Sequence, residues 1–159
     1  MRDGFEEIAR HYDTLMSHVN YERWLIVASE LACLLPKSFR HLDAACGTGV
    51  LLNKLRHIGW NATGADLSLS MLGVARRRMP DAALVAADLR AMPYIGAFDY
   101  ITCLFDSINF LLSEADLHAA MHNIAAALKP GGLIYFDVVT ERMVLQHFAE
   151  QEWTESQGR

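Results

Sequence analysis

Residues 41–49 read His-Leu-Asp-Ala-Ala-Cys-Gly-Thr-Gly, a short apolar run that enters a turn of small residues. Gly47 and Gly49 have no Cβ, so the backbone can turn sharply there and approach a ligand closely. A helix is predicted over residues 50–58, and the unpaired N–H groups of its first turn point toward whatever the turn holds. The stretch therefore predicts a strand, a turn and a helix that together cradle a nucleotide.

The spacing of the glycines argues against a dinucleotide such as NAD. The dinucleotide fingerprint has a third small residue three positions after its second glycine, where this chain has the bulky Leu52. A nicotinamide oxidoreductase therefore stays a weaker hypothesis.

Length and composition predict one ordinary globular domain. The chain has 159 residues, 52% of them hydrophobic and 21% charged, and a net charge of −5. This charge argues against a nucleic-acid partner, since no basic cluster is longer than Arg76-Arg77-Arg78. The three cysteines show no disulfide or zinc spacing, and no apolar run is long enough for a membrane span or a signal peptide. We therefore expect a soluble, cytoplasmic protein without a membrane partner.

Short apolar runs alternate with longer segments of helical period, which is the pattern of an α/β protein. The strands are predicted over residues 41–45, 62–65, 83–86, 100–104 and 133–138, and the helices over 21–35, 50–58, 68–78, 114–128 and 141–150. Gly59, Pro80 and Pro130-Gly131-Gly132 are predicted to close helices. The strands are almost continuously apolar, as in a parallel sheet with helices on both faces. We expect a Rossmann-like, doubly wound sheet.

In such a sheet the ligand lies beyond the carboxyl ends of the strands. Asp66 follows the second predicted strand and lies 19 positions after Gly47, where a carboxylate is expected to accept hydrogen bonds from ribose hydroxyls. The alternative is that Asp66 caps the next helix, although Ser68 already offers a good N-cap. Leu67 and Met71 would form an apolar wall for an adenine, and Met71 fits ordinary core packing equally well.

Asp88 and Leu89 follow the third predicted strand. There a carboxylate can accept a hydrogen bond from an adenine amino group while a neighbouring backbone N–H donates to a ring nitrogen. The alternative is a turn aspartate without a ligand.

Residues 43–49 resemble motif I of the class I S-adenosylmethionine-dependent methyltransferases, with Ala45 in place of the first glycine. Further segments resemble the later motifs of that family in order: Gly64-Ala-Asp-Leu-Ser, Ala87-Asp-Leu-Arg, Phe98-Asp-Tyr-Ile and Leu128-Lys-Pro-Gly-Gly-Leu. The resemblance covers about residues 10–140. It implies S-adenosylmethionine as the cofactor, S-adenosylhomocysteine as its product, and methyl transfer to an unidentified small-molecule acceptor.

The resemblance also implies roles for individual residues. Asp43 would order the glycine turn and reach the amino group of the cofactor, and Leu104 and Phe105 would lie where the methyl donor meets its acceptor. Tyr12 would belong to an N-terminal lid over the cofactor, or else to the apolar face of a helix. The segment after Leu104 departs from the Asn/Asp-Pro-Pro-aromatic pattern of nucleic-acid base methylation. No catalytic residue is assigned, and Asp106 fits a general base or a helix cap.

No metal site is predicted. His118 and His122 are spaced four apart on a predicted helix, but no third ligand lies near them in the sequence, so a solvated helix face is the better interpretation. Cys46 lies in the glycine turn without a group that would lower its pKa, so it is not expected to be a nucleophile.

The whole chain is expected to form one S-adenosylmethionine-binding domain: residues 1–36 as lid and helices, 37–139 as core, and 140–159 as a helix and a stub. Members of the family continue the sheet with two more strands, so we expect this shorter chain to stop at five strands in the order 3-2-1-4-5. The unpaired edge of the fifth strand predicts self-association. A shortened, poorly active methyltransferase is expected, and a nucleoside-binding module without catalysis is the alternative.

Overall fold

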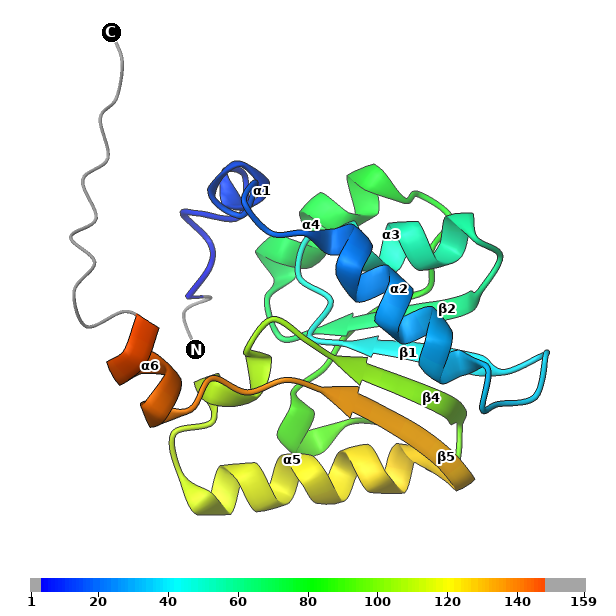
Figure 1. The fold of residues 1–159 in the computed structure, drawn as a ribbon. Coiled ribbons are helices and arrows are strands. Elements are labelled where there is room, and N and C mark those ends of the chain that lie inside the picture. The colour runs from blue at the N-terminus through cyan, green and yellow to red at the C-terminus, as the bar shows by residue number, and fades with distance from the viewer. Residues whose placement is uncertain (1–3, 148–159) are drawn as a thin grey trace, which may run out of the picture.

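The computed structural model describes residues 4–147, and its centre is a parallel sheet in the order β3-β2-β1-β4-β5 (Figure 1). The strands are β1 Arg40–Ala44, β2 Asn61–Asp66, β3 Leu84–Ala86, β4 Phe98–Cys103 and β5 Leu128–Phe136. The predicted doubly wound, Rossmann-like sheet and its strand order are confirmed. The order reverses between β1 and β4, the first strand pairing with β2 on one side and β4 on the other.

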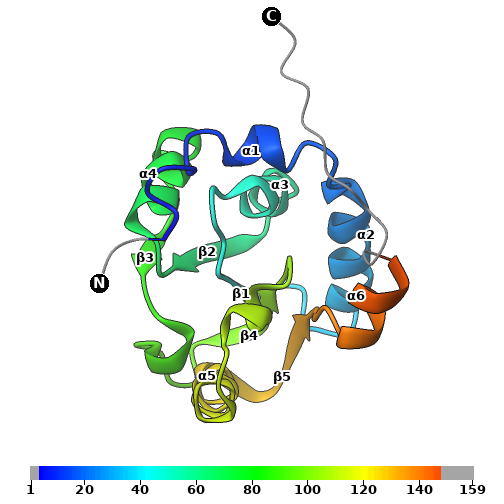
Figure 2. The ribbon, with the colours of Figure 1, turned by 90° about the vertical axis from the view of Figure 1, so that its left-hand side faces the viewer.

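The helices lie on both faces of this sheet (Figure 2). They are α1 Tyr12–Leu15, α2 Tyr21–Ala32, α3 Val50–His57, α4 Leu69–Arg78, α5 Glu114–Ala127 and α6 Glu141–His147, with 3-10 turns at Leu89–Ala91 and Ser107–Phe110. On one face, Ile124 and Ala127 of α5 pack against buried Leu42 and Ile101 of the sheet. On the other face, α2 and α3 pack together through Ala28, Leu51 and Leu55. Helix α4 belongs to the same layer, because its Ala75 clusters with Leu52 of α3.

The prediction was wrong about the start of β5. This strand begins at Leu128, directly after α5, and the segment Pro130-Gly131-Gly132 lies inside it at a shift of register. Gly131 has a φ of +79°, and a Cβ at Gly132 would lie 2.9 Å from the carbonyl oxygen of Lys129. These glycines therefore form a bulge within the strand, because no side chain fits there, and they do not close the helix.

The other boundaries differ from the prediction by a few residues. The second helix ends at Ala32, β4 begins at Phe98, and β5 ends at Phe136. The described part of the C-terminal helix ends at His147, so residues 148–150 of the predicted helix and the stub with Trp153 lie outside the described residues. Within residues 4–147, no helix is long and apolar enough to cross a membrane.

Candidate functional site

A cavity of about 270 Å³ opens at the carboxyl ends of the strands. It brings together all of the residues that the sequence predicts as cofactor-binding, namely Tyr12, Asp43, Ala45, Gly47, Asp66, Leu67, Met71, Asp88, Leu89, Leu104 and Phe105. The prediction missed other residues of the lining, among them Phe5, Tyr21, Arg90, Phe110 and Asp116. Phe5 and the start of α5 come into the lining only through the fold, so strand-end motifs could not have identified them.

Asp66 connects the end of β2 to the glycine turn. One carboxylate oxygen accepts the backbone N–H of Gly47 at 2.7 Å, and the other accepts that of Ser68 at 2.8 Å. The N-cap of α4 is Ser68, whose hydroxyl accepts the N–H of Met71. Asp66 is therefore not the cap of the helix, and its carboxylate faces the cavity while it holds the turn.

The turn between β1 and α3 depends on left-handed backbone. Ala45, Gly47 and Gly49 have φ values of +61°, +55° and +76°. A Cβ on Gly49 would lie 2.5 Å from the methyl carbon of Met79, so this glycine allows the end of α4 to pack closely against the turn. In contrast, a Cβ on Gly47 would meet no protein atom within 4 Å. The space beside Gly47 belongs to the cavity, and Ala45 adopts a conformation that costs about 1–2 kcal/mol for an L-residue.

Asp43 lies at the bottom of the cavity, and its side chain is almost fully buried. Its Oδ1 atom accepts a hydrogen bond of 2.8 Å from the hydroxyl of Thr102 on β4. Burial raises the pKa of the Asp43 carboxyl to about 7, and the nearby carboxylate of Asp66 adds to this rise. A cation bound above Asp43 would therefore be strongly favoured, because it would stabilise the charged form.

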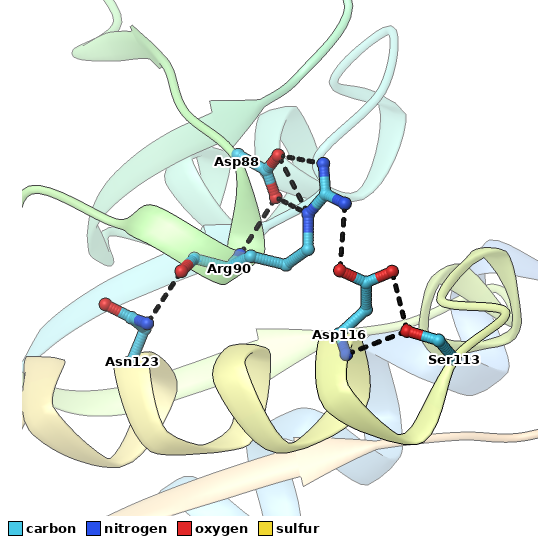
Figure 3. Close-up of polar contacts among 5 residues, drawn as sticks. All are labelled: Asp88, Arg90, Ser113, Asp116 and Asn123. Atoms are coloured by element: carbon cyan, nitrogen blue, oxygen red, sulfur yellow. Dashed lines mark hydrogen bonds and ion pairs between the residues drawn. The ribbon is translucent and has the colours of Figure 1, made fainter.

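Asp88 and Asp116 are joined by Arg90 at another side of the cavity (Figure 3). The guanidinium binds both carboxylate oxygens of Asp88, with contacts of 2.6 to 3.0 Å, and it reaches Asp116 at 3.0 Å. The hydrogen bonds from Arg90 hold the pKa of Asp88 below its usual range. Ser113 donates to Asp116, and Asn123 donates to the carbonyl oxygen of Arg90, so the loop after β3 is fixed to α5.

The N-terminal segment covers the cavity from the side of α3 and α4. Asp13 of α1 accepts hydrogen bonds from the hydroxyl of Thr48 and from Arg78 of α4, which also donates to the carbonyl oxygen of Thr48. The ring of Phe5 contacts those of Tyr12 and Phe110, with centroids 6.2 and 5.8 Å apart. Tyr12 thus lies in α1 and lines the cavity, and its place in a lid over a cofactor stays a prediction.

The segment after β4 contains two consecutive residues in the left-handed region, Phe105 and Asp106, with φ values of +60° and +50°. The carboxylate of Asp137 accepts the N–H of Asp106 at 3.1 Å, and the Phe105 ring packs against Tyr21 and Trp24. The Asp106 side chain makes no capping hydrogen bond to the following 3-10 turn. Asp106 therefore occupies the N-cap position of this turn through its backbone alone, and its role as a general base stays a prediction.

The ionisable lining of the cavity is mainly acidic. It contains the carboxyl groups of Asp43, Asp66, Asp88 and Asp116, and among the described residues Arg90 is its one basic side chain. Because Arg90 pairs with two of these carboxylates, the field inside the cavity favours a cationic ligand.

Comparison with known proteins gives a consistent result. A family model described as "Methyltransferase domain" matches residues 42–132. The putative methyltransferase YqeM of Bacillus subtilis (strain 168) is 30% identical over 155 residues, which is 95% of this chain and 62% of that protein. The dTDP-3-amino-3,6-dideoxy-alpha-D-glucopyranose N,N-dimethyltransferase of Streptomyces fradiae is 39% identical over 132 residues, which is 80% of this chain and 51% of that protein.

Solved structures of similar proteins share the fold. The structure of S-adenosylmethionine-bound CalS10, an amino pentose methyltransferase from Micromonospora echinaspora, matches with a TM-score of 0.73 and 30% identity over 82% of this chain and 56% of that one. An S-adenosylmethionine-dependent methyltransferase from Clostridium acetobutylicum matches with a TM-score of 0.74 and 29% identity over 89% of this chain and 60% of that one. The chain thus spans 51% to 62% of the length of these relatives.

Proposed function

We propose that this chain, which belongs to the class I S-adenosylmethionine-dependent methyltransferase family, binds S-adenosylmethionine in the cavity and transfers its methyl group to a small-molecule acceptor. The observation that carries the proposal is the gathering of the glycine turn and the strand-end acids Asp43, Asp66 and Asp88 around one cavity. S-adenosylhomocysteine would be the product left in the site.

The residues fit the parts of this cofactor. Asp66 would accept the ribose hydroxyls, and Leu67, Met71 and Leu89 would form the surroundings of the adenine. Asp43 would face the amino group of the methionine part, and the segment of Leu104 and Phe105 would lie near the transferred methyl group. The acidic lining supports a ligand that carries both an ammonium and a sulfonium charge.

Methyl transfer is an in-line displacement at the carbon bound to the sulfonium, so the protein contributes mainly by positioning. Holding the two reactants in line can contribute about 7–11 kcal/mol in the most favourable cases. The aromatic packing of Phe105 on Tyr21 and Trp24 supports a fixed wall at this end of the cavity. A base would be needed only for an acceptor that must lose a proton, and no residue is assigned this role.

For the acceptor we propose a small molecule with an amino group. The similarity to the enzyme from Streptomyces fradiae, whose name specifies an amino sugar, supports an amine. A demethylmenaquinone methyltransferase from Thermus thermophilus is also 38% identical over 139 residues. A quinone is therefore the alternative outcome of an acceptor screen.

Two measurements test the function. Isothermal titration should detect binding of S-adenosylhomocysteine, and labelled S-adenosylmethionine should transfer its label to a member of a panel of amines, amino sugars and quinones. Binding without transfer to any member, including the small molecules of a cell extract, would favour the nucleoside-binding module. An absence of binding would contradict both functions, and tighter binding of NAD would favour an oxidoreductase.

We further propose that the chain self-associates through β5, acts in the cytoplasm and has no nucleic-acid or membrane partner. Support for self-association comes from the sheet order, in which β5 pairs with β4 and has no second strand among the described residues. An unpaired strand edge is a template for pairing with another chain. Sedimentation velocity at increasing concentration should reveal a dimer, and a monomer at all concentrations would contradict this contact.

A further inference from the structure

A chain of three buried polar side chains runs from the interior of the sheet to the cavity. Nε2 of the His41 ring on β1 lies 3.0 Å from the hydroxyl oxygen of Thr102 on β4. The same hydroxyl oxygen lies 2.8 Å from Oδ1 of Asp43. His41 and Thr102 are 0% exposed and Asp43 is 4% exposed. Strands β1 and β4 are paired, with Asp43 opposite Thr102, so the sheet itself fixes this geometry.

The direction of the hydrogen bonds follows from the surroundings of His41. Burial lowers the pKa of the ring to about 3, so the ring is neutral and carries one proton. Its Nδ1 atom has no hydrogen-bond partner among the described residues, and the ring packs against those of Trp60 and Tyr100. A bare N–H is costlier to bury than a lone pair, which assigns the proton to Nε2. Nε2 then donates to Thr102, and the single hydroxyl proton of Thr102 is committed to Asp43.

Asp43 has no compensating cation in the described part of the chain, where none of the ion pairs includes it. The ionisable groups that face it are the carboxylate of Asp66 and the thiols of Cys46 and Cys103, besides His41 behind Thr102. Burial raises the pKa of both thiols well above the usual range, so they stay neutral. A buried carboxyl in these surroundings favours its protonated form until a cation arrives.

We propose that Thr102, held by His41, is a positioning residue that aims the carboxyl of Asp43 into the cavity, and that this carboxyl gives up a proton when a cationic ligand binds above it. This inference rests on the proposed function, because the cation is the ammonium group of S-adenosylmethionine or S-adenosylhomocysteine. In the empty site the carboxyl holds a proton on part of the molecules near neutral pH. On binding, that proton passes to the solvent, and the carboxylate and the ammonium group form an ion pair.

The test is to count protons by isothermal titration of S-adenosylhomocysteine in buffers that differ in ionisation enthalpy. At pH 6–7 the amino group of the ligand is mostly protonated, so a proton that appears in the buffer comes from the protein. We expect the wild-type chain to release about half a proton per binding event at pH 7 and more as the pH falls to 6. Binding without release between pH 6 and pH 7 would overturn this inference alone. A wild-type chain that does not bind the ligand would overturn this inference together with the proposed function.

Three variants separate the positioning role from a general effect on packing. Thr102→Val keeps the shape of the side chain but removes the donor, so binding at pH 7 should weaken about ten-fold. Its proton release should extend to higher pH, because the hydrogen bond from Thr102 lowers the pKa of Asp43. Thr102→Ser should restore the wild-type profile. Thr63→Val, a matched change on β2 away from the cavity lining, should leave the proton count unchanged.

His41→Phe tests the outer end of the chain. The aromatic replacement keeps the contacts with Trp60 and Tyr100 but leaves the hydroxyl of Thr102 free to turn away from Asp43. We expect its proton release to shift in the same direction as that of Thr102→Val, by a smaller amount. If Thr102→Val and His41→Phe release protons over the same pH range as the wild type, Thr102 does not act through Asp43.

Discussion

Gly47 and Asp66 are joined across 19 positions of the sequence by a hydrogen bond of 2.7 Å from the glycine N–H to a carboxylate oxygen. The acid at the end of β2 and the turn after β1 therefore form one unit on neighbouring strands. A carboxylate oxygen can accept more than one hydrogen bond, so Asp66 can hold the turn and still accept a hydrogen bond from a ligand. A substitution of Gly47 or Asp66 should therefore alter both the glycine turn and the position of the Asp66 carboxylate in the cavity.

Replacing Asp66 with alanine should weaken the binding of S-adenosylhomocysteine about ten-fold or more. The change removes a charged acceptor, whose hydrogen bonds are worth about 1.5–3 kcal/mol, and it also releases the N–H of Gly47. Isothermal titration measures the loss. Asp81→Ala, at an exposed position outside the cavity lining, is the matched control and should bind normally. Equal affinities for the two variants would contradict a role of Asp66 in ribose binding.

Gly47→Val should abolish binding and leave a folded protein. The left-handed φ of +55° strains any side chain, and the added atoms would occupy open space that belongs to the cavity. Gly59→Val is the matched control, because Gly59 also has a left-handed φ, of +91°, and open space around its Cβ, but lies outside the cavity lining. Both variants should lose stability, measured by thermal unfolding, and only the first should lose binding. Normal binding by Gly47→Val would mean that the ligand is not held at the glycine turn.

Ala45→Gly should make the protein more stable by about 0.5–1 kcal/mol. The φ of +61° at Ala45 is costly for a residue with a Cβ, and part of the gain is offset by the greater entropy of glycine in the unfolded chain. Urea unfolding measures the difference in the free energy of unfolding. Ala44→Gly, one position earlier in β1 and fully buried, should instead destabilise the protein by about 1 kcal/mol. A destabilised Ala45→Gly variant would mean that backbone strain does not dominate at this position.

The sequence was sufficient to predict the sheet because β1, β2 and β4 are short, largely buried segments separated by longer segments of helical period. It was also sufficient to predict that Asp66 lies at the same edge of the sheet as the glycine turn, since parallel strands bring their carboxyl ends to one edge, but it did not predict the hydrogen bond between Gly47 and Asp66. The start of β5 could not be predicted, because Pro130 and two glycines have the composition of a turn and only the pairing of Phe98 with Leu128 places them in a strand.

The contacts that the sequence did not reveal are side-chain pairs without a fixed spacing. Arg90 is two positions from Asp88 in an irregular segment, and its second partner, Asp116, is 26 positions away. Asp13 and Arg78 are 65 positions apart. Neither helical nor strand periodicity constrains such pairs, because they depend on how separate elements pack in space.

Arg90→Met should lower the thermal midpoint of unfolding by a few degrees at neutral pH, since it leaves two carboxylates without their shared cation. The pKa values of Asp88 and Asp116 are both lowered, first of all by hydrogen bonds from Arg90. A lowered native pKa adds stability above the unfolded value, about 4, and this stability is lost as the pH falls through the native values. The difference in thermal midpoint between the wild type and Arg90→Met should therefore become smaller below about pH 4.

Differential scanning calorimetry between pH 3 and pH 7 measures this trend. Arg77→Met, at an exposed position of α4, is the control and should differ little from the wild type over the whole range. A difference in thermal midpoint between the wild type and Arg90→Met that stays constant down to pH 3 would contradict the ion-pair explanation. The stabilisation would then come from packing of the aliphatic part of the arginine side chain.

Arg78→Met should accelerate the dissociation of S-adenosylhomocysteine about three- to ten-fold, on the scale of one ordinary hydrogen bond or one partly exposed ion pair. Arg78 and Thr48 both bind the carboxylate of Asp13, so α1 is attached to the glycine turn by a contact that must break if the lid opens. The ion pair is partly exposed, which means that added salt should speed dissociation from the wild type and change the variant less. Stopped-flow displacement measures both rates. Asp13→Asn should resemble Arg78→Met, the double variant should add little to either, and Arg77→Met should match the wild type. A wild-type rate in Arg78→Met would mean that the ligand leaves without movement of α1.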